Sequence, residues 1–168
     1  ALWRATIKPR LAAAIEAAKA VNPEILIFYH GDGNMERIVP EVIESGVDSV
    51  EHGFFMRDDQ LARMRDRRIA WVPTFAPVQL QVNEAKRYGW DETVVANLQR
   101  ILDAHAASLR QAHALAIQVL AWTVNEPHQM ARLMDLGVDG IVTDRPDLLR
   151  EEMQRRGMAL PLATPVQP

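Results

Sequence analysis

Two five-residue patterns with nearly the same sequence constrain the fold most. They are GVDSV at residues 46–50 and GVDGI at residues 137–141. In each, the glycine can take the left-handed conformation that ends a helix, and the apolar residues near the aspartate can begin a strand. A second pair, TVNEP at 123–127 and VTDRP at 142–146, places an Asn or Asp helix cap two residues before a first-turn proline. Turns into strands and turns into helices alternate, which predicts βα units.

Apolar runs between these turns predict about five strands. Residues 25–29 form a continuous apolar run bounded by Pro23 and Gly31, which is typical of a strand buried on both faces. Further strands are predicted near residues 47–50, 69–72, 117–123 and 140–143. Alternation of such strands with helices implies a parallel sheet with right-handed crossovers. A chain of 168 residues is too short for eight units with their helices. The predicted fold class is α/β, with TIM-barrel-type βα repeats and about five parallel strands in a partial barrel.

Helix signals occupy the segments between the predicted strands. Pro9 suits a first turn of a helix that ends near Asn22, and Asp91 can cap the longest helix. Other helices are expected after residues 34, 58, 125 and 144, the last ending near Gly157. No regular element is expected between Pro73 and residue 91. The prediction is a single domain over residues 1–157 and a flexible tail over 158–168.

Composition and charge exclude several classes of partner. The net charge is −3, with 19 basic and 22 acidic residues interspersed, so no basic stripe favours nucleic acid. The absence of cysteine excludes disulfides and thiolate metal sites. No apolar run approaches the roughly 20 residues of a membrane span, and no leader-like segment opens the chain. The expectation is a cytoplasmic or recombinant protein that is not secreted and has neither nucleic-acid nor membrane partners.

Three segments of the chain resemble three different families. The patterns IKPRL at 7–11 and YHGDGN at 29–34 make residues 1–47 resemble the uroporphyrinogen decarboxylase superfamily. Residues 47–114 resemble imidazolonepropionase-like amidohydrolases through VDSVEHG at 47–53, WVPT at 71–74 and the predicted helix that carries His105 and His113. Residues 117–157 are similar to the end of glycerophosphodiester phosphodiesterases through WTVN at 122–125 and DGIVTDRPD at 139–147. All three resemblances imply a (βα)8-type barrel, but they do not imply one reaction.

The succession of three resemblances predicts an engineered or recombined chimera, joined near residues 47 and 115. In this interpretation the chain is a barrel scaffold with no evolved activity, because strand-to-helix turns are interchangeable at matched geometry. The alternative is a metal-dependent hydrolase of the amidohydrolase or phosphodiesterase type with an incomplete site. The patterns that complete those sites, a His-x-His pair in one family and early His-Arg and Glu-Leu-Asp elements in the other, are absent from the sequence.

Three polar residues at predicted strand ends could hold a metal. His30, His52 and Asp144 follow strands whose carboxyl ends form the active face of a barrel. The amidohydrolase resemblance implies histidines after the fifth and sixth strands and an aspartate after the eighth as ligands, and His52 matches the sixth-strand pattern. Two imidazoles and one carboxylate suit Zn, Mn or Fe(II). The main expectation is no cofactor, with a divalent metal such as Zn as the alternative.

Four other residues could contact a substrate. Trp122 and Asn125 could line a pocket, although Trp122 can also pack at the barrel rim and Asn125 can cap a helix. Gly31 and Gly33 could hold a phosphate at a helix N-terminus, although turns of this kind often only reverse the backbone.

An unclosed parallel sheet implies a partner. Its two edge strands leave backbone groups unpaired, and each unmade buried hydrogen bond costs on the order of 1 to 3 kcal/mol. Two copies that meet at these edges would satisfy them, so a homo-oligomer, most simply a dimer, is expected. The monomeric alternative is an open doubly wound sheet with helices on both faces.

Overall fold

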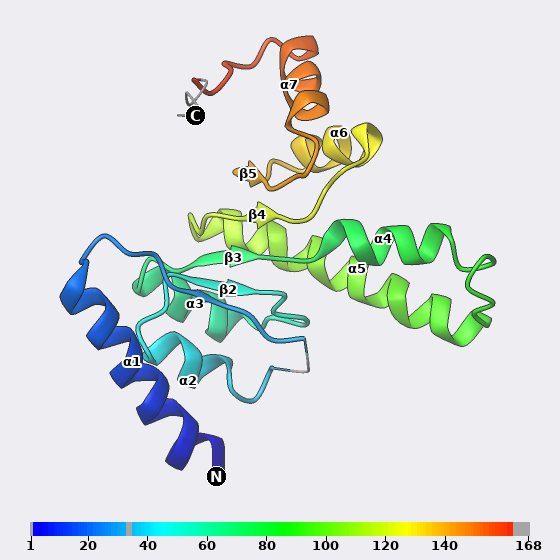
Figure 1. Ribbon diagram of the computed structural model, residues 1–168. Coiled ribbons are helices and arrows are strands. Elements are labelled where there is room, and N and C mark those ends of the chain that lie inside the picture. The colour runs from blue at the N-terminus through cyan, green and yellow to red at the C-terminus, as the bar shows by residue number, and fades with distance from the viewer. Residues whose placement is uncertain (1, 33–34, 163–168) are drawn as a thin grey trace.

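Five short parallel strands, joined in sequence by helices, form the centre of the computed structural model, which describes residues 2–32 and 35–162 (Figure 1). The first three strands pair in the order β1-β2-β3, and the last two pair with each other. A bridge between Trp71 and Val119 joins the two groups, and the Trp71 amide donates to the Gln118 carbonyl at 2.9 Å. The strands are β1 (Phe28–Tyr29), β2 (Ser49–Glu51), β3 (Ala70–Val72), β4 (Leu120–Ala121) and β5 (Gly140–Ile141).

Helices occupy every connection between consecutive strands. A π-helical turn, η1, leads directly into α1, and α4 packs along the long helix α5 (Figure 1). The helical elements are η1 (Trp3–Ile7), α1 (Lys8–Val21), α2 (Val39–Glu44), α3 (Asp58–Asp66), α4 (Phe75–Asn83), α5 (Glu92–Ala114), α6 (Pro127–Asp135) and α7 (Pro146–Arg155). The predicted fold class is confirmed: the chain is a parallel α/β protein of TIM-barrel-type repeats in a partial barrel.

The two repeated sequence patterns form the same turn. Gly46 and Gly137 have φ angles of +93° and +80°, which are left-handed conformations that glycine adopts without strain. Asp48 Oδ2 accepts a hydrogen bond of 2.8 Å from the backbone amide of Ile27, one strand earlier. Asp139 Oδ2 accepts an equal bond from the amide of Val119. Each aspartate therefore ties the start of its own strand to the start of the preceding strand.

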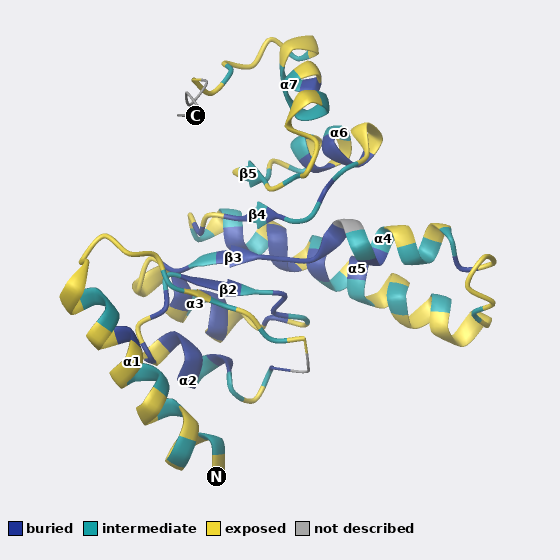
Figure 2. Cartoon of the chain, in the orientation of Figure 1, coloured by how far each residue is buried: buried dark blue, intermediate teal, exposed yellow. Residues whose placement is uncertain are grey.

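The hydrophobic core lies on the central strands and the helices packed against them (Figure 2). Trp71 on β3 is completely buried and donates its indole N–H to the His52 carbonyl at 3.1 Å. Burial of an aromatic side chain of this size is among the larger stabilising contributions in a domain. The other fully buried large apolar side chains are Val39, Val42, Ile43, Val50, Leu61, Met64, Leu109, Val119 and Met130.

Two local predictions are wrong. The run at residues 25–29 is not buried on both faces: Leu26 is 64% exposed and Phe28 58% exposed, because β1 pairs with β2 alone (Figure 2). The segment after Pro73 is not irregular, because α4 occupies residues 75–83. Pro77 is the third residue of α4, where a backbone N–H has no partner within the helix, so the proline does not interrupt it.

The C-terminal end of the described chain follows α7. Residues 158–162 have no regular secondary structure, and Arg150 Nη1 donates to the Pro161 carbonyl at 2.9 Å. The rest of the predicted tail, residues 163–168, lies outside the described residues. Among the described helices, none combines the length and apolar character needed to cross a membrane.

Candidate metal centre

Three potential metal ligands meet where β1 and β2 end. His30 directly follows β1 and His52 directly follows β2, and Asp32 lies in the turn after His30. The Nε2 atoms of His30 and His52 lie 3.3 and 3.2 Å from the same Asp32 oxygen, Oδ1. One ligand atom from each residue falls within 4.8 Å of the other two. Parallel strands end at one edge of a sheet, which is why residues far apart in sequence converge here.

A second set of side chains fixes both imidazole rings from behind. The Nδ1 of His30 lies 2.7 Å from Glu51 Oε2, and Glu51 is the last residue of β2. The Nδ1 of His52 shares a hydrogen bond with the hydroxyl of Thr74, which follows β3 and is buried. A hydrogen bond at one ring nitrogen sets the tautomer and orientation of the other nitrogen, as in most histidine metal sites. Both Nε2 atoms are therefore directed to the common point beside Asp32.

Aromatic rings close one side of the cluster. Trp122, which directly follows β4, has its ring 5.6 Å from the rings of both His30 and His52. Phe54 stacks on His52 at 5.6 Å. Asp32, in contrast, has a side chain that is 84% exposed. The cluster is thus walled by aromatic side chains on one side and open to solvent at its carboxylate.

The backbone after β2 has a conformation that the cluster requires. His52 and Gly53 have φ angles of +60° and +56°. A Cβ atom on Gly53 would lie 2.9 Å from the Trp71 indole nitrogen, and the positive φ would strain any larger residue. Glycine at position 53 therefore allows the chain to turn here while Trp71 holds the His52 carbonyl.

The two histidines have opposite pKa shifts. The hydrogen bond to Glu51 raises the pKa of His30, against the opposing effect of burial and with help from the Asp32 charge. Burial lowers the pKa of His52, and the neighbouring His30 lowers it further. The lowered pKa of His52 favours the neutral imidazole, which is the form that binds a metal.

The residues present fit a divalent ion. His52 Nε2 is buried and has no assigned hydrogen-bond partner among the described residues, although Asp32 Oδ1 lies 3.2 Å away. A buried ring nitrogen of this kind is costly unless a ligand satisfies it. Two imidazole nitrogens and one carboxylate oxygen are a donor set used for Zn, Mn and Fe(II), and three protein ligands leave positions for water or substrate.

Of the three predicted metal ligands, the structure brings two together. His30 and His52 meet as the sequence suggested, but Asp144 is not a member of the cluster. The Asp144 carboxylate accepts from Asn125 Nδ2 at 3.0 Å, and its backbone amide donates to Asn125 Oδ1 at 2.9 Å. The third position near the histidines belongs to Asp32, which the sequence analysis treated only as part of a turn.

The remaining predicted residues have varied positions. Trp122 lies against both histidines, whereas Asn125 links the ends of β4 and β5 and does not cap α6. Gly31 packs so closely on Met35 that a Cβ would lie 2.6 Å from its sulfur. Gly33 lies outside the described residues, so phosphate binding by this turn stays a prediction.

Two residues that support the candidate ligands were not identified from the sequence. Glu51 and Thr74 hold the candidate ligands, yet each resembles an ordinary polar residue at a strand end. The sequence offered one indication for Glu51, which is that it directly precedes a candidate histidine. Side chains of neighbouring strands can lie side by side at the end of a sheet, so a residue at this position can reach the histidine of the neighbouring strand. Thr74 could be assigned only once β2 and β3 were known to be neighbours.

Comparison with known proteins assigns the chain to a family. The sequence model of the glycerophosphoryl diester phosphodiesterase family matches residues 54–148, which is more than half of the chain. The chain therefore belongs to the glycerophosphoryl diester phosphodiesterase family. The three candidate metal ligands lie before the matched segment, whereas Trp122, Asn125 and Asp144 lie within it.

One named relative agrees with the chain over a short length. A Mycobacterium tuberculosis protein named "Probable glycerophosphodiester phosphodiesterase 2" is 55% identical over 51 residues, which are 30% of this chain and 19% of that protein. The chain thus matches about a fifth of that relative's length.

Two solved structures share the fold. A prolidase complexed with N-methylphosphonate-L-proline has a TM-score of 0.55 and 17% identity over 69% of this chain and 28% of its own. An amidohydrolase has a TM-score of 0.52 and 14% identity over 86% of this chain and 32% of its own. At these identities the likeness concerns the fold alone.

The family match corrects the main functional expectation. The expected engineered scaffold with no evolved activity is wrong, because one natural family spans residues 54–148. That span crosses residue 115, where a junction between fragments was expected, so the description as a de novo chimera is wrong as well. The resemblance of the C-terminal part of the chain to glycerophosphodiester phosphodiesterases is confirmed. The resemblances of the two earlier segments stay predictions.

Proposed function

We propose that the chain is a divalent-metal-dependent hydrolase of phosphodiesters, with the ion held by His30, Asp32 and His52. The observation that carries the proposal is the convergence of two histidine Nε2 atoms on one carboxylate oxygen at the carboxyl ends of parallel strands. The family to which residues 54–148 belong supports phosphodiesters as the substrate class. Glycerophosphodiesters are the specific substrates that the family name favours.

The protein groups have separate roles in this proposal. A bound divalent ion supplies Lewis-acid polarisation of a phosphoryl oxygen and lowers the pKa of water at the site. His30 and His52 bind through Nε2, while Glu51 and Thr74 keep both rings in the binding orientation. Trp122 and Phe54 exclude solvent from the aromatic side of the cluster.

Exposure determines the direction of substrate approach. The Asp32 side chain is largely in solvent, whereas His52 is almost completely buried. A diester would reach the site from the Asp32 side, with its leaving alcohol near the Trp122 ring. An indole ring next to a charged centre offers an apolar surface to the alcohol and an N–H donor, and the Trp122 Nε1 has no hydrogen-bond partner among the described residues.

The test combines metal content with turnover. Protein loaded with Zn or Mn is dialysed and measured by emission spectroscopy, and hydrolysis of sn-glycero-3-phosphocholine is followed by release of choline. We expect one bound ion per chain for the parent protein. His52→Ala and Asp32→Ala should lose both the ion and the turnover, whereas the control His113→Asn should keep them. Equal metal content in His52→Ala and the parent protein would refute the site; bound metal without diester turnover would refute the substrate class.

A further inference from the structure

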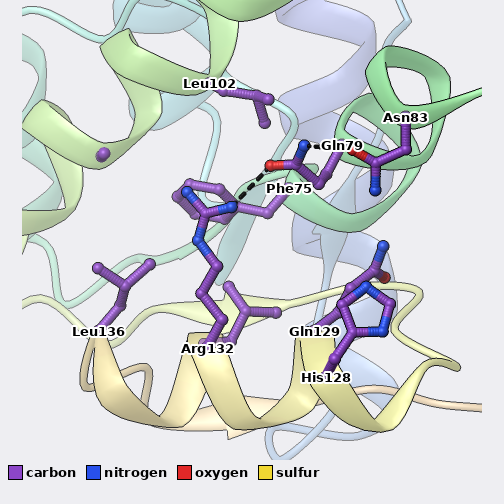
Figure 3. Close-up of a pocket in the computed structure, with 10 residues that line it drawn as sticks. Phe75, Gln79, Asn83, Leu102, His128, Gln129, Arg132 and Leu136 are labelled. Atoms are coloured by element: carbon purple, nitrogen blue, oxygen red, sulfur yellow. Dashed lines mark hydrogen bonds between the residues drawn. The ribbon is translucent and has the colours of Figure 1, made fainter. Parts of the chain in front are cut away.

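A second site lies away from the metal centre, in a cavity of about 200 Å³ between α4, α5 and α6 (Figure 3). Its lining contains none of the three candidate metal ligands. Phe75, Leu102 and Leu133, which are all buried, supply apolar walls from three different helices. A concave apolar space with a few polar groups at its edge is the usual form of a small-molecule site.

The polar edge of this cavity has one permanent cation. Arg132 of α6 reaches across the opening and donates from Nη1 to Gln79 Oε1 of α4 at 2.8 Å (Figure 3). Gln79 in turn donates from Nε2 to Asn83 Oδ1 at 3.0 Å. No Asp or Glu is among the lining residues, and the partner found for the Arg132 guanidinium within the described chain is the neutral amide of Gln79. A guanidinium held by an amide keeps most of its charge and its other N–H donors for a ligand.

A second polar side chain lines the cavity on α6. Gln129 is only 7% exposed, and it is one of the lining residues. Its carboxamide carries two N–H donors from which a bound group could accept hydrogen bonds. Gln129 and Arg132 lie one turn apart on α6, so both can reach one bound group.

We propose that this cavity binds a small monocarboxylate with an apolar body. The carboxylate would accept hydrogen bonds from Arg132 and Gln129, and the body would lie among Phe75, Leu102 and Leu133. A single guanidinium balances one negative charge, and its planar N–H pair matches carboxylate oxygens. Since a cavity of about 150 Å³ holds benzene, this cavity accepts a phenyl group or a branched chain of similar size.

The test uses 3-phenylpropionate and its neutral analogue 3-phenylpropionamide. Each is titrated into the full chain and followed by amide chemical shifts in ¹H–¹⁵N spectra. We expect saturable shifts on α4, α5 and α6, with the carboxylate bound at least about tenfold more tightly than the amide. Arg132→Gln should remove that preference. Arg110→Gln, which changes an exposed arginine elsewhere on α5, should retain it.

A second variant tests the cavity without relying on the charge. Ala106→Phe fills the space from α5 and should weaken binding of both compounds by at least about tenfold. Equal affinity for acid and amide, unchanged preference in Arg132→Gln, or the absence of shifts at about 10 mM ligand would each overturn the proposal. Dissociation of an oligomer by Ala106→Phe, measured by sedimentation, would also overturn it, because a second copy of the chain would then be the occupant.

Discussion

The imidazole rings of His30 and His52 lie with their centroids 4.7 Å apart and direct their Nε2 atoms to the same oxygen of Asp32. Each ring is held at its other nitrogen by a different residue, Glu51 for His30 and Thr74 for His52. The orientation of the rings therefore depends on groups that do not belong to the ligand set. This dependence makes the supporting residues testable separately from the ligands.

Removal of Glu51 should weaken metal binding without removing a ligand. Glu51→Ala leaves His30 Nδ1 without its acceptor, and loss of such a partner typically lowers metal affinity by about 10- to 100-fold. Competition for Zn against a chromophoric chelator measures the change. Glu16→Ala, at an exposed position of α1, is the matched control. Equal Zn affinity in Glu51→Ala and the control would contradict the assigned role.

Acid should destabilise the fold through His105. Its ring is enclosed by Phe54, Trp71 and Phe75. Both ring nitrogens lack hydrogen-bond partners among the described residues. Burial lowers the pKa of His105 to about 4. The unfolded chain binds a proton at His105 below about pH 6.5, which the folded chain resists. The contribution of His105 to the free energy of unfolding should therefore be complete above pH 6.5. It should fall by about 1.4 kcal/mol per pH unit between pH 6.5 and pH 4.

The comparison variant for this pH effect is His105→Leu. Urea unfolding between pH 7 and pH 4 is measured for both proteins. Carboxylates that titrate at the acid end of this range affect the two proteins equally. We expect the difference in unfolding free energy between the two proteins to change by about 3 kcal/mol over the full interval between the two pKa values. Parallel pH profiles would show that His105 is not held neutral by the fold.

The two repeated turns should have equal importance for stability. Asp48→Ala and Asp139→Ala each remove the acceptor of a backbone amide at the start of the preceding strand. Each variant should lower the free energy of unfolding by about 1 to 3 kcal/mol, measured by urea titration. Asp103→Ala, at an exposed position of α5, should change it little. A loss confined to one of the two turns would show that they are not equivalent.

Asn125 should act together with Asp144. Its side chain bonds both the carboxylate and the backbone amide of Asp144, which joins the segments after β4 and β5. Asn125→Ala should cost about 1 to 2 kcal/mol of unfolding free energy, again by urea titration. The double variant Asn125→Ala/Asp144→Ala should cost less than the sum of the single variants, because the residues share bonds. Strict additivity would exclude the pairing.

We propose that the chain associates as a homodimer through an exposed strand edge. Within the described chain, β1 and β5 each pair with one strand only, and Phe28 of β1 is 58% exposed. Sedimentation at micromolar concentration should give a dimer for the parent chain and a monomer for Phe28→Lys. A charged residue opposes edge-to-edge pairing, which explains the expected change. A monomeric parent chain would contradict this proposal.

Local patterns were sufficient to predict most of the architecture. Gly46, Asp48, Gly137 and Asp139 set the same turn twice, and such turns depend on few neighbours, so the sequence indicated them correctly. The helix α4 was missed because Pro77 suggests a break, whereas its position in the first turn makes it compatible with a helix. Burial of residues 25–29 was overestimated because the edge position of β1 is a property of the whole sheet.

The candidate site was predictable only in part. His30 and His52 were identifiable because they directly follow apolar strand segments. The carboxylate beside the two histidines was not identified: Asp144 occupies a similar strand end, but it is hydrogen-bonded to Asn125, and Asp32 reaches the histidines from the turn after β1. Convergence of side chains depends on strand order and turn shape, which single residues do not reveal.

The origin of the candidate metal ligands and their supporting residues has one further consequence. Glu51 is 21 residues from His30 and Thr74 is 22 residues from His52, so the ligands and their supports come from three consecutive βα units. Helices α6 and α7 contribute none of them. Sequence changes within α6 can therefore reshape the apolar cavity without altering a candidate ligand or its hydrogen-bonded support, although Trp122, just after β4, still lies against both histidine rings.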